Sequence, residues 1–249
     1  MRGPDTIIPD WPAPAAVRAA FTLRTGGVSQ PPFDSCNIGA HVGDEPHAVA
    51  QNRARLRARL ELRAEPAWLE QIHGHRVVDL DALPPFESPG AADAAVTRTA
   101  GRICAIQVAD CMPVLFAAAD GSAVGAAHAG WRGLAGGVLA ATVGAMKTPP
   151  GALLAWLGPA IGAAHFEVGE EVRAAFLEGD RGAGSAFTAN RRGRWQCDLY
   201  ALARRKLTAL GVSSVHGGDW CTYADAGRFF SYRRDGRCGR MAALIWRAS

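Results

Sequence analysis

Three short segments of the chain carry residue types that can bind a transition metal and do chemistry with it. They are Gln71-Ile72-His73-Gly74-His75, Ala109-Asp110-Cys111 and His128-Ala129-Gly130-Trp131-Arg132-Gly133. Each segment follows an apolar run that is typical of a strand. Loops at the ends of strands in α/β folds converge on one crevice, even when they are far apart in sequence. We therefore expect His73, Cys111 and His128 to lie together.

This donor set suits Zn²⁺, because one soft thiolate and two imidazoles leave a fourth coordination position open to water. An open position is typical of a catalytic site. The same residues allow a structural interpretation, since a buried cysteine is often a small apolar side chain and a histidine beside glycine often lies in a turn. Asp110 could accept a hydrogen bond behind the ligands, carry a proton or cap a turn.

Two further clusters could contact a substrate. Asn37 and His41 lie on a glycine-bearing segment that could approach a ligand closely, or that could form an ordinary Asx-type turn. The segment FFSYRR at 229–234 sets aromatic rings beside two guanidinium groups. These could stack a planar base and bind a phosphate, or the phenylalanines could belong to the core and the arginines to the surface.

Hydrophobic spacing predicts the helices that position these segments. One helical face over residues 45–60 carries Val49, Arg53, Leu56 and Leu60. Arg53 is therefore expected on an inward-facing stripe. A second helix is predicted over 198–210, with Asp198 as N-cap and Gly211 at its end. Further helices are predicted after Gly133 and after Glu167.

Short apolar runs predict the strands, at residues 19–23, 103–108, 114–118, 124–127, 153–157 and 242–246. Most of these runs are apolar on both faces, as buried central strands are. Residues 179–194 are expected to form a surface loop, because the stretch is rich in glycine.

Composition narrows the class of protein. The chain has 249 residues, 49% of them hydrophobic, with no shift in composition along its length, so a single domain over 1–249 is expected. The net charge of +4 comes from scattered basic residues, which argues against nucleic acid as a partner. Residues 1–11 lack the apolar stretch of a secretory signal, and no apolar run is long enough to cross a membrane. Six cysteines without a CxxC pair fit reduced thiols in a cytoplasmic protein.

A set of motifs resembles a known family that is variously called multicopper polyphenol oxidase (laccase), YfiH-like, peptidoglycan editing factor and purine nucleoside phosphorylase. The resemblance covers most of the chain and its motifs are highly specific. They are FTLRTGGVS at 21–29, NIGAHVGD at 37–44, NR at 52–53, QIHG at 71–74, ADA at 92–94, ADCMPV at 109–114, HAGWRG at 128–133, GPAIG at 158–162, FEVG at 166–169, CT at 221–222 and FSYRR at 230–234.

The resemblance implies that His73, Cys111 and His128 bind zinc, with copper as a less favoured metal. It also implies a fold of the α/β (α+β) class, a layered sandwich of mixed β-sheets flanked by helices that resembles the Cys-His toxin deamidases. The implied partners are purine nucleosides and phosphate, without nucleic acid or membrane, and we expect a monomer or a weak homodimer.

The implied activities are phosphorolysis of adenosine, inosine and methylthioadenosine to the base and a sugar 1-phosphate, and hydrolytic deamination of adenosine. Zinc lowers the pKa of a bound water from about 15.7 to about 7, which favours attack on C6 of adenine. Phosphorolysis also needs a positioned phosphate. The predicted catalytic residues are His73, Asp110, Cys111 and His128. The predicted substrate-binding residues are Asn37, His41, Arg53, Ser231, Arg233 and Arg234, of which the three arginines are the phosphate candidates.

Three alternatives remain open at the level of sequence. Cys111 and His128 could be the nucleophile and base of a metal-free amide or acyl hydrolase that acts in peptidoglycan precursor editing. A copper polyphenol oxidase would need many histidine ligands, whereas this chain has seven histidines and one HxH. The third alternative is a module that binds a nucleotide or muropeptide without turnover. A degraded ligand set would favour it, but all three ligand positions carry a metal-binding residue here.

Overall fold

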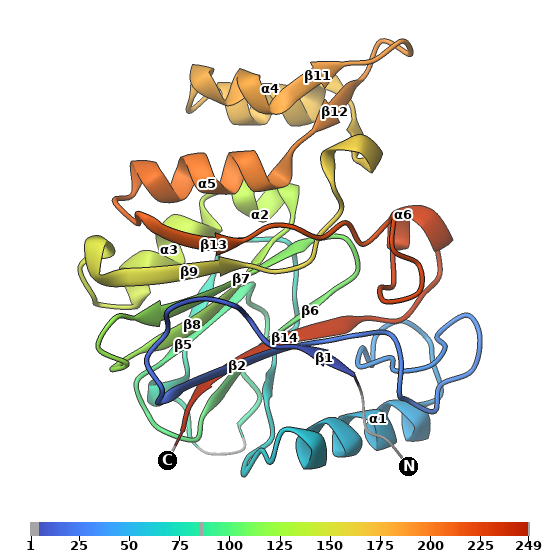
Figure 1. Ribbon diagram of the computed structural model, residues 1–249, viewed down its shortest axis with the longest axis vertical. Helices are drawn as coiled ribbons and strands as arrows, with labels where there is room; N and C mark the ends of the chain where they lie inside the picture. Colours follow the sequence, from blue (N-terminus) through green and yellow to red (C-terminus); the bar gives the residue numbers. More distant parts are fainter. Residues whose placement is uncertain (1–4, 85–86, 249) are drawn as a thin grey trace.

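Two β-sheets stack face to face in the computed structural model, which describes residues 5–84 and 87–248 (Figure 1). The first sheet has the order β1 (Thr6–Ile7), β2 (Val17–Thr22), β14 (Met241–Arg247), β6 (Ile103–Val108) and β3 (Ala67–Trp68). The second has the order β13 (Ser214–Gly217), β9 (Leu153–Leu157), β7 (Met112–Ala118), β8 (Val124–Ala129), β5 (Ala94–Thr97) and β4 (Val77–Asp79). Both sheets contain parallel and antiparallel pairs.

Helices cover the outer faces of this pair of sheets. Helix α1 (Pro46–Arg59) packs on the first sheet, where Leu56 meets Ala105 and Leu244. The second sheet is covered by α2 (Trp131–Ala135), α3 (Val138–Ala145) and α5 (Leu199–Ala209), as Figure 1 shows. Beyond α5 lie α4 (Glu170–Leu177) and a small sheet of β10 (Glu167–Val168), β12 (Trp195–Cys197) and β11 (Phe187–Ala189). The remaining helical segments are α6 (Tyr232–Asp235), η1 (Leu80–Ala82), η2 (Pro150–Ala152), η3 (Ala163–His165) and η4 (Arg181–Ala186).

The core between the two sheets explains why the central strands are apolar on both faces. Phe21 and Ile106 of the first sheet share a buried cluster with Leu115 and Ala126 of the second. Every residue of β5, β6, β7, β8 and β9 is buried, because each strand has a sheet on one side and helices, or more of the core, on the other. The predicted layered sandwich of mixed sheets flanked by helices is confirmed. The likeness to toxin deamidases stays a prediction.

The predicted elements agree with the structure where hydrophobic spacing is strong. Strands β6 and β9 have the predicted bounds, and α5 begins after Asp198, whose carboxylate accepts the N–H of Ala201. The helix ends at Ala209, and its C-cap residue Leu210 is followed by Gly211 at φ +86°, a conformation that favours glycine. Residues 179–194 differ from the expected loop, because they contain η4 and β11, which pairs with β12.

The inward face of α1 also differs from its prediction. Asn52, rather than Arg53, is the fully buried polar residue of this helix. Its amide donates to Ser29 Oγ and the Asn37 carbonyl, each at 2.9 Å, so it ties the helix to the loop of residues 28–37. Arg53 is half-buried, donates from Nε to the Ile38 carbonyl and stacks on a tryptophan ring. Asparagine therefore fits here, since every buried amide group finds a partner.

The N-terminal segment, in which no signal sequence is expected, begins with residues 1–4, and these lie outside the described residues. Among the helices of the described chain, none combines the length and the apolar character that crossing a membrane requires.

Candidate metal centre and substrate pocket

The antiparallel pairing of β7 with β8 brings the predicted cysteine and histidine together. Met112 pairs with Ala129 and Pro113 pairs with His128. Cys111 directly precedes β7, so it lies opposite the end of β8. The convergence at strand ends thus arises here from a hairpin between neighbouring antiparallel strands.

Asp93 connects the third ligand to this hairpin. It directly precedes β5, which pairs antiparallel with β8, so its carboxylate reaches His128 Nδ1 at 2.8 Å. The same carboxylate accepts the backbone N–H groups of Ile72, His73 and Gly74 at 3.2, 2.9 and 2.6 Å. His73 has φ +60°, an unfavourable conformation for a side chain that these bonds offset. One buried carboxylate therefore positions two of the three predicted ligands.

The ligand atoms of His73, Cys111 and His128 all lie within 4.8 Å of one another. The two imidazole rings meet edge to face with centroids 4.8 Å apart. Gly130 has to be small, because a Cβ there would lie 2.9 Å from Cys111 Sγ and 3.2 Å from His73 Nδ1. Gly133 is constrained in the same way by the carbonyl oxygen of Gly74, at 2.9 Å. The glycines of the HAGWRG segment thus permit the three loops to approach.

The charges around this trio suit a cation. Burial alone would lower the pKa of His128, but the negative charge of Cys111 and the hydrogen bond to Asp93 outweigh it and raise that pKa to about 9. Burial and the positive charge of His128 lower the pKa of His73. A carboxylate only accepts, so Nδ1 of His128 carries its hydrogen and Nε2 is the ligand nitrogen. A thiolate, two imidazoles and a carboxylate behind one of them fit zinc.

The trio lines a pocket of about 500 Å³. This volume falls in the range of small-molecule sites, about 300–1,000 Å³. Its lining also includes His41, Asp110, Arg132, Tyr232, Arg233, Arg240, and the half-buried or buried residues Gln71, Gln107, Trp131, Ile161 and Phe166. Three guanidinium groups and one carboxylate make the lining basic, which favours an anionic or phosphate-bearing ligand.

Asp110 joins the segment of Cys111 to the C-terminal motif. It has φ +85°, and its buried carboxylate accepts Thr222 Oγ1 at 2.6 Å, Ser231 Oγ at 3.0 Å and the backbone N–H of Arg233 at 2.7 Å. Its contacts are those of a carboxylate that positions neighbouring loops. They also place Arg233 beside the trio, since both lie in the lining of one pocket.

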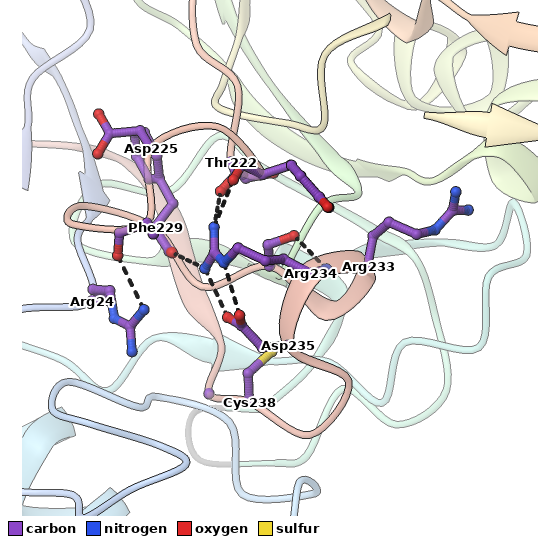
Figure 2. Close-up of polar contacts among 12 residues, drawn as sticks. Arg24, Thr222, Asp225, Phe229, Arg233, Arg234, Asp235 and Cys238 are labelled. Carbon is purple, nitrogen blue, oxygen red and sulfur yellow. Dashed lines mark hydrogen bonds and ion pairs between the residues drawn. The ribbon is translucent and has the colours of Figure 1, made fainter. Parts of the chain in front are cut away.

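Arg233 and Arg234 are adjacent in sequence but have different environments, as Figure 2 shows. The Arg234 guanidinium donates to the carbonyls of Thr222, Tyr223 and Phe229 and pairs with Asp235 at 2.7 Å. Arg233 points away from this cluster, is exposed, lies over the Phe166 ring and donates to the Glu167 carbonyl at 2.8 Å. Arg234 therefore holds the loop together, whereas Arg233 faces the pocket.

Three other predicted substrate-binding residues, Asn37, Arg53 and Ser231, do not line the pocket within the described residues, and neither does Arg234. Asn37 is buried and accepts from the N–H of Gly39 and of Arg240, the Asx-type turn that the sequence left open. Ser231 caps α6 and donates to Asp110. Phe229 and Phe230 are fully buried and belong to the core between the sheets.

Sequence reasoning assigned no role to Asp93, Arg132, Arg240 or Gln107. Asp93 and Arg132 lie in motifs that carry the resemblance, but their contacts depend on strand pairing that the sequence does not show. Burial, together with the positive charges of Arg240 and Arg53, lowers the pKa of His41. Gln107 is 6% exposed, and its side-chain oxygen has no hydrogen-bond partner in the part of the chain that the structure describes.

The fold and this site define a class of protein, and comparison with known sequences places the chain within it. The family model described as multi-copper polyphenol oxidoreductase laccase matches residues 18–248, and the chain belongs to that family. A protein of Pseudomonas aeruginosa named purine nucleoside phosphorylase is 54% identical over 241 residues, covering 96% of this chain and 97% of the relative. One of Escherichia coli, named purine nucleoside phosphorylase YfiH, is 50% identical, with 96% and 98% covered.

Solved structures agree with this placement. A crystal structure of a Neisseria meningitidis protein has a TM-score of 0.93 to this fold at 50% identity, covering 98% of this chain and 99% of the other. The crystal structure of YlmD from Geobacillus stearothermophilus has a TM-score of 0.87 at 32% identity, with 94% and 93% covered. The layered arrangement is thus shared across most of each chain.

Proposed function

We propose that this protein is a zinc-dependent purine nucleoside phosphorylase that cleaves adenosine, inosine and methylthioadenosine, and that it also deaminates adenosine. The observation that carries the proposal is the trio of His73, Cys111 and His128 in the wall of a basic pocket of about 500 Å³. The names of the relatives support the substrate class. A thiolate and two imidazoles favour zinc over copper as the resident metal, although a copper label is attached to the family.

In phosphorolysis, a phosphate oxygen forms a bond to C1′ of the ribose while the bond from C1′ to the purine nitrogen breaks and the purine leaves with the electron pair. Arg132, Arg233 and Arg240 are the residues that can bind the phosphate, since each lines the pocket. Arg53 and Arg234, the other sequence candidates, lie outside the pocket lining. The lowered pKa of His41 leaves its ring neutral near pH 7, so it can accept a proton from phosphate.

The purine would lie against Tyr232 and the Gln107 carboxamide. Tyr232 is 60% exposed in the pocket wall, a large apolar surface that a planar base can cover. The unpartnered oxygen of Gln107 can accept a hydrogen bond from a base N–H. A zinc ion bound by the trio would activate water for deamination at C6 of adenine. His73, Cys111 and His128 would hold that ion, with His128 oriented by Asp93.

The deciding experiment incubates zinc-loaded protein with adenosine, with and without phosphate, and separates adenine, inosine and hypoxanthine by chromatography. We expect adenine and ribose 1-phosphate only when phosphate is present, and inosine in both conditions. Zinc-loaded protein that forms none of these products would exclude the proposal.

A pair of variants tests the proposed phosphate-binding site. Arg233→Ala should raise the KM for phosphate, with a smaller effect on the KM for the nucleoside, because one guanidinium contact to a dianion is lost. Arg192→Ala is the matched control, since this arginine is exposed and lies outside the pocket lining. An unchanged KM for phosphate in Arg233→Ala would show that Arg233 does not bind the phosphate.

A second candidate function is supported by one specific contact. Cys111, His128 and Asp93 can act as the nucleophile, the base and the orienting carboxylate of a triad like those of cysteine hydrolases. Without metal, the trio could therefore attack an amide or acyl carbonyl, as in peptidoglycan precursor editing. The two functions separate on metal removal, since a chelator should abolish purine turnover but release the thiolate for hydrolysis.

A further inference from the structure

A second thiol and imidazole pair lies outside the metal trio. Cys221 Sγ is 3.5 Å from Nδ1 of His165, and the backbone N–H of Gly162 donates to the same sulfur at 3.2 Å. The His165 ring stacks on Tyr223, with centroids 4.5 Å apart and planes 18° apart, which fixes its orientation. Both members of the pair are half-buried, so they are neither sealed in the core nor free in solvent.

The pair lacks the ligands of a metal site. Within residues 5–84 and 87–248, three or more His, Cys, Asp or Glu donors cluster closely enough to hold a metal only at the trio of His73, Cys111 and His128. Zinc sites in proteins use at least three protein ligands. The chemistry that remains is that of a thiol beside a base. The imidazole can accept the thiol proton, and the Gly162 N–H can stabilise the resulting negative sulfur.

The remaining thiols of the chain are poorly suited to react. Burial raises the pKa of Cys36 and of Cys197 to about 12. Burial also raises the pKa of Cys104 and of Cys238. These four side chains are buried and stay protonated near pH 7. Cys111 is engaged in the trio, so Cys221 is the thiol that both has a base and is not enclosed.

We propose that Cys221 is a thiol modification site that reacts with low-molecular-weight disulfides. His165 takes the proton of the Cys221 thiol, and the sulfur attacks one sulfur of the disulfide. A new S–S bond joins Cys221 to half of the reagent, and the other half leaves as a thiolate that takes up a proton. Cys221 is oxidised, the reagent is reduced, and a second thiol reverses the exchange.

Intact-mass measurement and peptide mapping test the site. Zinc-loaded protein is treated with oxidised glutathione near pH 7. We expect one glutathione adduct per chain, located at Cys221 and removed by dithiothreitol. Cys221→Ser should form no adduct, and the four buried thiols, as internal controls, should react only after denaturation. A first adduct at another cysteine, or no adduct on native protein, overturns the proposal.

The role of His165 is tested by rate. The dithiobis(nitrobenzoate) reaction of His165→Gln at pH 7 should be about tenfold slower or more, because the local base is lost. Its rate should recover at higher pH, where the thiol ionises without help, which a purely structural role would not produce. If the pH profile of the wild-type reaction rate matches that of a free cysteine, His165 does not act as a base for Cys221. This measurement uses the wild-type protein alone, so it does not depend on the folding of a variant.

Discussion

The two pairs of cysteine and histidine in this molecule, Cys111 with His128 and Cys221 with His165, place the same side chains in different surroundings. Behind His128 stands the Asp93 carboxylate, and a third donor, His73, is within 4.8 Å of the other ligand atoms. Behind His165 stands the aromatic ring of Tyr223. A charged acceptor and a third donor favour a cation, whereas a stacked ring and a single backbone N–H favour a free thiol.

Their positions in the fold account for this difference. The first pair lies where β5, β7 and β8 end together in the six-stranded sheet, so three loops are available to supply ligands. The second pair joins η3 to residue 221 through an isolated bridge between Ala160 and Cys221, so only two segments meet. The number of chain segments that converge thus sets how many donors a site can have.

The largest expected effect separates the two cysteines by metal content. Cys111→Ala should lose bound zinc and all purine turnover, because two protein ligands hold zinc far less tightly than three. Cys221→Ala, the matched control, should retain both. Zinc per chain is measured by mass spectrometry of metals after dialysis. Full zinc content in Cys111→Ala would place the metal elsewhere.

Asp93→Asn tests the carboxylate that the second pair lacks. We expect zinc affinity to fall by about 10–100-fold, since an amide cannot stabilise the ligand form of His128 as a carboxylate does. Asp81→Asn is the control, because Asp81 also accepts side-chain and backbone hydrogen bonds, from Thr97 and Arg98, but away from the trio. Equal zinc affinity in both variants, titrated against a competing chelator, would show that Asp93 only shapes the loop.

The sequence predicted the members of the first site better than the contacts that hold them. Strands such as β6 and β9 could be predicted because their apolar runs depend on local spacing. The bond between Asp93 and His128 could not, because it joins residues 35 apart through the pairing of β5 with β8. The buried position of Asn52 could not be predicted either, because its partners lie in a loop that helix periodicity does not reveal.

The same limit applies to the pocket. Arg233 and Arg234 are chemically identical in the sequence, and only their surroundings distinguish them. Arg234 donates to three backbone carbonyls and pairs with Asp235, whereas the Arg233 guanidinium donates to the Glu167 carbonyl and stays exposed. The second pair also escaped prediction, since His165 and Cys221 are 56 residues apart and meet across a single bridge. Side-chain partners that depend on non-local register therefore have to be observed.

Metal-free protein should show a pH dependence to which the first pair contributes and the second does not. The pKa of His128 is raised to about 9 in the folded state, above about 6.5 in the unfolded chain. Its contribution to stability is therefore fully present below pH 6.5 and is lost as the pH rises through 9. We expect the free energy of unfolding to fall by about 3 kcal/mol at most over this window.

Denaturant titrations of chelator-treated protein between pH 6.5 and about pH 8 measure the start of this loss, because above about pH 8.5 ionisation of the buried thiols in the unfolded chain also lowers the stability. Asp93→Asn should flatten the dependence, because the hydrogen bond that helps to raise the pKa is weakened. His165→Gln should leave it unchanged, which ties the effect to the first pair. Stability that rises over the same window would mean that His128 is neutral in the metal-free fold.

The smallest expected effect is communication between the two pairs. A sulfur that carries an adduct can no longer accept the Gly162 N–H in the same geometry, and a Cβ at Gly162 would already lie 3.2 Å from that sulfur. The next residue toward the pocket, Ile161, lines it and donates its N–H to the Asp110 carbonyl at 3.0 Å. Modification at Cys221 should therefore shift one wall of the pocket.

We expect the glutathione adduct to lower kcat for inosine phosphorolysis by about tenfold or less, below the roughly 100-fold that a 1 Å misplacement at the reacting atoms can cost. Zinc content should not change, because Ile161 bonds to the Asp110 carbonyl rather than to a predicted ligand. Treated Cys221→Ser is the control and should keep its kcat. If wild-type protein that is fully modified at Cys221 keeps its kcat, the two pairs are independent, and a shift of Ile161 does not move the substrate.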